Sequence, residues 1–167
     1  MSLAGAPPAS ALVLPEMCVG CVTLRYERHL DLAHPRLVIR TAASPISDEA
    51  VDALISFSSR VLERGESYSC LWDLSSVCTP RAGPIWRCVN WAAKNKRALD
   101  ANLVAVAIVM GGGGIRKVVE FVLWITRPPM PQRCFDDTDA ALEFAKTVDA
   151  PATSAESPIR WPHNFTL

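Results

Sequence analysis

The chain has 167 residues, half of them hydrophobic, which is enough for one domain with a sizeable apolar core. Its 17 basic and 17 acidic residues give a formal net charge of zero, which argues against general binders of nucleic acid or anionic membranes, since both need a basic excess. No apolar run approaches the roughly 18 residues of a membrane span. The first residues have neither the basic start of a signal peptide nor the arginines of a transit peptide, so we expect a soluble, cytoplasmic protein.

Composition divides the chain into three regions. Residues 1–16 are rich in Ala and Pro and predict a loose leader. Residues 17–148 carry regular hydrophobic periodicities and predict a single α/β domain. Residues 149–167 turn to Pro, Ser, Thr and Ala, which predicts a poorly ordered tail.

The domain begins with two predicted strands. Val22, Leu24 and Tyr26 alternate with polar residues, a pattern typical of a half-buried strand. A polar loop follows, and residues 36–42 supply a second strand, paired antiparallel with the first.

A helix, a buried strand and a second helix come next. Ser47 is a suitable N-cap for the first helix, and Gly65 is a suitable stop. The aromatic and apolar run 68–74 predicts a buried strand. Pro80 suits the first position of a helix that we expect to reach Leu99. Its expected buried face consists of Ile85, Trp86, Val89, Ala92 and Ala93.

The last part of the domain repeats the alternation of strand and helix. Residues 103–110 are almost entirely apolar, as in fully buried parallel strands. Helical spacing over 115–123, a short strand over 132–135 and a final helix capped by Asp136 or Asp137 complete the order ββαβαβαβα. This order predicts an α/β fold with a mixed, mainly parallel sheet of about five strands and about four helices.

The region from Val19 to Lys146 resembles the STAS domain, the anti-sigma-factor antagonist domain. The segment WDLSSV resembles that family's strand ending in Asp-Leu-Ser, and RKVVEF followed by RCFDDTDAALEF resembles its third helix, last strand and acid-capped final helix. The resemblance implies a non-enzymatic binding or regulatory domain. Regulatory members carry a phosphorylated Ser in an Asp-Ser-Ser-Gly-type turn, whereas this chain reads CTPRAG there, with Thr79 as the nearby hydroxyl.

Polar residues and bare glycine backbone follow the two central strands. The first group is Asp73, Ser75, Ser76, Thr79 and Arg81, and the second is Gly111, Gly112, Gly113, Gly114 and Arg116. Ligands of open α/β sheets bind outside the carboxyl ends of neighbouring strands, so we expect these groups to meet and to suit a phosphate or a phosphorylated partner. The glycine run matches neither common nucleotide-binding pattern, and a flexible loop beside the solvated cations Arg116 and Lys117 is the alternative interpretation.

Cysteine and histidine patterns predict no metal site and no cofactor. Cys18 and Cys21 form a C-x-x-C motif, but no second pair stands at zinc-binding spacing. The histidines, His29, His34 and His163, do not form a set of metal ligands. No catalytic triad or carboxylate pair is readable, so no catalytic residue is assigned and an enzyme ranks last among the functions.

Two functions remain open from the sequence. The first is a regulatory module whose partner is another protein, bound through the Ser75–Gly83 loop and the helix after it. The second is a carrier of a nucleotide or a lipid in a cleft between Ser75–Arg81 and Gly111–Lys117.

Overall fold

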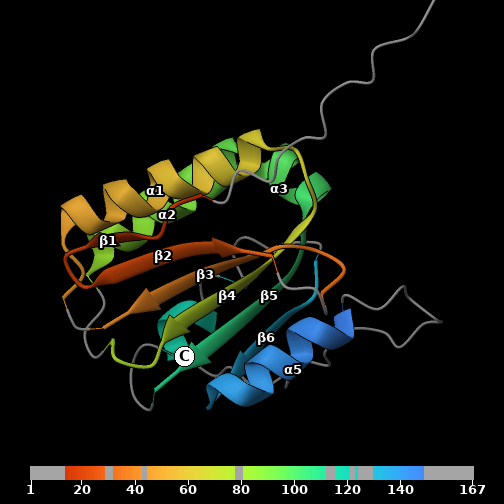
Figure 1. Ribbon diagram of the computed structural model, residues 1–167. Helices are drawn as coiled ribbons and strands as arrows, with labels where there is room; N and C mark the ends of the chain where they lie inside the picture. Colours follow the sequence, from red (N-terminus) through yellow and green to blue (C-terminus); the bar gives the residue numbers. More distant parts are fainter. Residues whose placement is uncertain are drawn as a thin grey trace, which may run out of the picture.

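A six-stranded sheet runs through the molecule with its strands in chain order, β1-β2-β3-β4-β5-β6 (Figure 1). The computed structural model describes residues 14–28, 32–42, 45–77, 81–111, 116–120, 123 and 130–148. The strands are β1 (Met17–Val19), β2 (Val22–Glu27), β3 (Arg36–Thr41), β4 (Tyr68–Leu74), β5 (Leu103–Met110) and β6 (Gln132–Phe135). The first two pairings are antiparallel, and the pairings from β3 to β6 are parallel. The predicted mixed, mainly parallel α/β fold is therefore confirmed.

The sheet has one strand more than the sequence predicted. The additional strand is the short β1. It forms a hairpin with β2 through a two-residue turn, because Val19 lies opposite Val22. Gly20 occupies the turn with a φ of +56°, a left-handed conformation that glycine adopts without steric cost.

Helix α1 (Asp48–Glu63) has the termini that the sequence predicted. The backbone N–H of Ala50 donates a hydrogen bond to Ser47 Oγ at 3.1 Å, so Ser47 is the N-cap. Gly65 follows the helix with a φ of +66°. Leu54, Phe57 and other apolar side chains of α1 are buried in the core cluster that includes residues of the sheet.

The predicted helix from Pro80 to Leu99 is two helices, α2 (Ala82–Lys94) and α3 (Lys96–Asn102). They are separated at Asn95, whose side-chain amide donates to the backbone oxygen of Trp91 at 2.9 Å. Pro80 itself lies outside the described residues.

The predicted buried face of this segment is partly wrong. Trp86 is 52% exposed and Ala93 is also exposed, whereas Pro84 is buried and Cys88 and Trp91 pack against the core. These three inward residues recur at helical spacing. The indole N–H of Trp91 donates to Ser59 Oγ of α1 at 3.0 Å, and this contact fixes which side of α2 faces inward.

After β5, residues 116–120 are helical, and β6 leads into α5 (Thr138–Val148). Asp137 caps α5, as predicted, because its Oδ1 accepts the backbone N–H of Ala140 at 2.8 Å. Ala141 and Ala145 are the buried residues of this helix.

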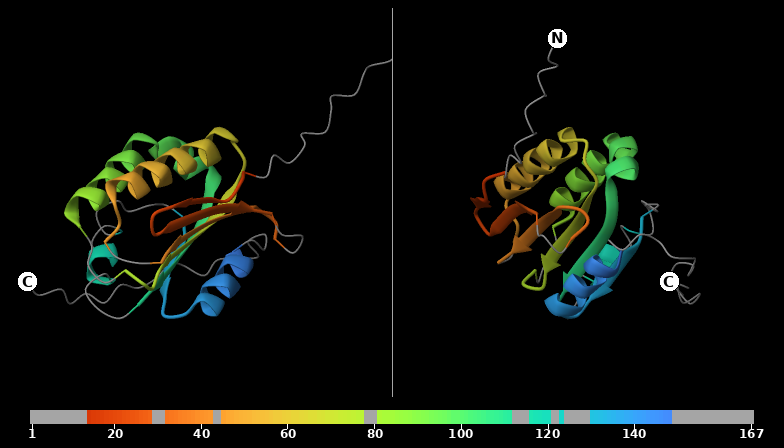
Figure 2. Two further views of the ribbon diagram at one scale, coloured as in Figure 1. Left: turned by 60° about the vertical axis from the view of Figure 1, so that its left-hand side comes forward. Right: turned by 45° about the vertical axis from the view of Figure 1, so that its right-hand side comes forward.

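Helices cover the two faces of the sheet unequally. Figure 2 shows α1, α2 and α3 together on one face and α5 on the other. The larger core cluster fills the first face, and a smaller cluster that includes Val38, Leu71 and Ala141 lies on the second face. There α5 packs over β4, β5 and β6. No helix in the described part of the chain is long and apolar enough to cross a membrane.

Candidate functional site

The carboxyl ends of β4 and β5 meet at one edge of the sheet, as the sequence predicted. The two strands are parallel neighbours, and Leu74 lies opposite Met110 in the register. The residues after them, Ser75 and Gly111, are therefore in direct contact. A β-carbon on Gly111 would lie 2.4 Å from the backbone oxygen of Ser75, so no side chain fits there.

Asp73 shapes the loop that follows β4. Its Oδ1 accepts hydrogen bonds from the backbone N–H of Ser75 at 3.0 Å and from Ser75 Oγ at 2.6 Å. The N–H of Val77 donates to the oxygen of Leu74 at 3.0 Å and closes the turn. The Asp73 carboxylate therefore braces its own loop.

Several predicted site residues of this loop are exposed at the surface. Ser75 and Ser76 lie in the turn, and Arg81 is the exposed N-cap residue of α2. The Arg81 side chain makes no capping hydrogen bond, as expected for a guanidinium, which has no acceptor atom. Thr79 and Gly112–Gly114 lie outside the described residues.

Arg116 has two carboxylate neighbours that the sequence did not predict. Its Nη1 lies 3.4 Å from Asp136 Oδ1, and its Nε lies 3.7 Å from Glu120 Oε1. These contacts direct the guanidinium toward the loop between β6 and α5. Acidic neighbours compete with any phosphate for this cation.

The exposed Trp86 lies on α2, one turn after Arg81, and the sequence did not identify it as a surface residue. The next residue, Arg87, holds this part of α2 against α1. Its Nη2 pairs with Asp52 Oδ1, and its Nη1 lies 3.6 Å from Asp48 Oδ1. The Trp86 indole is therefore exposed on a helix that ion pairs hold against α1.

The cysteines of the C-x-x-C motif lie apart. Cys18 is exposed and lies across from Thr23, with Sγ 3.7 Å from Thr23 Oγ1. Cys21 packs against the larger core cluster on the other face. Within the described ranges, no group of three His, Cys, Asp or Glu side chains is placed to hold a metal ion. Folding without zinc stays a prediction.

Comparison with known proteins identifies the fold. No family model matches the chain, and no curated protein does. A crystal structure of an uncharacterized protein from the DUF3478 family, with a SpoIIAA-like fold, from Shewanella loihica PV-4, is similar with a TM-score of 0.59. The two chains are 15% identical, and the match covers 77% of this chain and 97% of the other. The chain therefore has a SpoIIAA-like fold, which confirms the STAS-like architecture.

Proposed function

We propose that this protein is a non-enzymatic regulatory module that binds another protein through the Ser75–Gly83 loop and helix α2. The observation that carries the proposal is the exposure of Trp86, the only large hydrophobic side chain exposed among the described residues. Tryptophan and arginine are the residues most enriched at the energetic centres of protein interfaces. Here Arg81 is the N-cap residue of α2, and Trp86 is the fifth residue of the same helix.

The described parts of this surface, the turn at Ser75 and helix α2, are held in place by contacts with the rest of the domain, which favours binding. Asp73 braces the turn at Ser75, and Gly111 packs directly beneath it. Helix α2 is held to α1 by Arg87 and by Trp91. A partner that docks on a preorganised surface loses less conformational entropy on binding.

Two charged side chains near the loop already have partners, which favours a binding surface over a catalytic site. Asp73 is engaged by Ser75, and Arg116 lies beside Asp136 and Glu120. The carrier alternative, with a nucleotide or lipid between Ser75–Arg81 and Gly111–Lys117, has less support, because Arg116 already has these carboxylate neighbours.

The experiment starts from a photo-crosslinking amino acid at position 90, which is exposed on α2 one turn after Trp86, in the chain expressed in cells, and from identification of the captured protein. Purified partner is then titrated with wild type, Trp86→Ala, Arg81→Ala and the control Arg97→Ala, which changes an exposed arginine on α3. We expect Trp86→Ala and Arg81→Ala each to weaken binding by about 2 kcal/mol, the usual scale of an interface hot spot. The control should bind as wild type does.

A partner whose affinity is unchanged by both substitutions on α2 would contradict the proposal. Circular dichroism and thermal unfolding of each variant establish that the fold is intact. Saturable binding of a nucleotide that is lost with Arg116→Ala would favour the carrier instead.

A further inference from the structure

The second face of the sheet carries a groove beside α5. Since α5 packs over β4, β5 and β6, it leaves the side chains of β2 and β3 on this face beside it. The groove has a volume of about 360 Å³, which lies at the small end of the range for ligand sites. Its walls come from β2, β3, β4 and α5, together with Leu32 from the loop between β2 and β3.

Apolar side chains form the middle of the groove. Val38 of β3 and Leu71 of β4 are buried neighbours in the sheet, and Leu142 of α5 packs against the same cluster. All three line the groove. Val38 and Leu71 are buried, so the apolar surface open to a ligand comes from the partly exposed Leu142 and from Leu32, which also lines the groove.

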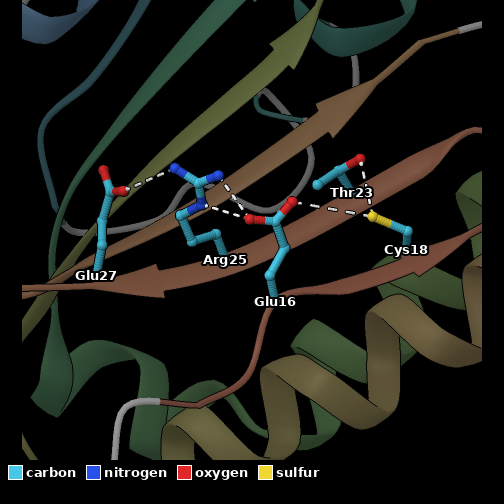
Figure 3. A network of polar contacts seen from close by, with 5 residues as sticks. All are labelled: Glu16, Cys18, Thr23, Arg25 and Glu27. Carbon is cyan, nitrogen blue, oxygen red and sulfur yellow. Dashed lines mark hydrogen bonds and ion pairs between the residues drawn. The ribbon is translucent and has the colours of Figure 1, made fainter.

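One side of the groove, along β2, carries one cation between two carboxylates. Arg25 donates two hydrogen bonds to Glu16 Oε2, at 2.9 and 2.5 Å, and its Nη1 lies 3.7 Å from Glu27 Oε2 (Figure 3). On the other side, Lys146 of α5 lies 2.6 Å from the exposed carboxylate of Glu143. These cations already have acidic neighbours.

Strand β3 carries an arginine at each end of the apolar surface. Arg36 and Arg40 lie on the same side of the strand as Val38, one on either side of it, and both line the groove. Arg36 is 3% exposed, whereas Arg40 is exposed. With the residues that the structure describes, Arg40 forms no ion pair. Guanidinium groups bind carboxylate and phosphate in a two-pronged geometry.

We propose that this groove binds a small amphipathic organic anion. The apolar body packs against Leu32 and Leu142, and the carboxylate or phosphate head pairs with Arg40 at the open end. Lys146 lies on the opposite wall and supplies a second cation, which can leave Glu143 and pair with the head group. The site lies on the opposite face of the sheet from α2, so it is separate from the proposed partner surface.

The test is a titration of the ¹⁵N-labelled full chain, followed by amide chemical shifts. The probes are octanoate and octyl phosphate, compared with uncharged 1-octanol and with inorganic phosphate. We expect saturable shifts at β3, β4 and α5 with both charged amphiphiles, and at least tenfold weaker binding of 1-octanol and of inorganic phosphate. The ratio of the two charged affinities distinguishes a carboxylate ligand from a phosphate ester.

Two double variants with the same change in net charge distinguish binding at this groove from a general effect of the protein's charge. Arg40→Gln/Lys146→Gln removes two exposed cations of the groove, and Lys94→Gln/Arg97→Gln removes two exposed cations of α2 and α3. We expect the first to weaken octanoate binding at least tenfold and the second to leave it within twofold. The proposal is overturned if neither charged amphiphile gives saturable shifts in the groove, if 1-octanol binds as tightly, or if both double variants lose binding equally.

Discussion

Gly111 lies so close to the backbone oxygen of Ser75 that a β-carbon on it would be 2.4 Å from that atom. This contact joins the ends of β4 and β5 and holds the loop that leads to α2. The spacing explains why glycine is required at this position, independently of any ligand. It also makes the proposed binding surface sensitive to the packing beneath it.

Gly111→Ala should lower the free energy of unfolding by about 1–3 kcal/mol, since the added methyl group overpacks a backbone contact. Gly83→Ala is the matched control, because a β-carbon there meets nothing within 4 Å. Within α2 that control should be neutral or stabilising by up to about 1 kcal/mol. Urea unfolding of the three proteins checks both expectations, and equal stability of wild type and Gly111→Ala would contradict the first.

Glu66 should make stability depend on acid pH. Desolvation raises the pKa of this carboxyl, but hydrogen bonds from Arg64 and Tyr26 and the charges of Arg64 and Arg28 outweigh it, so the net pKa is lowered. A carboxyl with a lowered folded pKa stabilises the protein above its unfolded pKa and loses this contribution as the pH falls through the folded value. We therefore expect Glu66→Gln to reduce stability at pH 7.

The same substitution should flatten the decline in stability between about pH 5 and 3. Urea unfolding across this range measures the effect. Glu63→Gln, which changes an exposed carboxyl of α1, serves as the control and should keep the wild-type profile. Identical acid profiles for Glu66→Gln and wild type would refute the assignment.

Thiol labelling should separate the cysteines by burial. Burial raises the pKa of the Cys70 thiol to about 12 and that of Cys88 to about 11, whereas Cys18 is exposed. Since the thiolate is the reactive form, iodoacetamide at pH 8 should modify Cys18 in the native protein and reach Cys70 only after unfolding. Peptide mapping by mass spectrometry gives the order, and early modification of Cys70 would show that its strand opens readily.

The tryptophans of α2 should differ sharply in their effect on stability. Trp86→Ala should change the free energy of unfolding by no more than about 0.5 kcal/mol, because the side chain is exposed. Trp91→Ala should lower it by about 3 kcal/mol through lost packing and the lost hydrogen bond to Ser59. Thermal and urea unfolding compare the two variants, and a large loss in Trp86→Ala would mean that this indole is part of the core.

Local signals predicted the fold well. Ser47, Gly65 and Asp137 act at helix ends as their residue types suggest, and the apolar run of β5 lies in the middle of the parallel sheet. The hairpin strand β1 is too short to produce an alternating pattern.

Features that depend on tertiary packing were not predictable. The side of α2 that faces inward depends on the contact between Trp91 and Ser59, which are distant in sequence. The carboxylates beside Arg116 come partly from the loop before α5, so the sequence could place Arg116 near the site without giving its neighbours. The groove is formed by the side chains on one side of β3 and by α5. The sequence shows which side chains of β3 share a side, but it does not show where α5 packs.

The strands lie in the sheet in the order in which they occur in the chain, and this order affects how the protein folds. Every strand pairs with the one made immediately before it, so each pairing closes only the loop between consecutive elements, at a small entropic cost. A chain emerging from the ribosome can add each strand to an edge that already exists, without waiting for distant sequence. Helix α5 then closes over β4, β5 and β6 as the last described element, which makes the second face the last part of the domain to be completed.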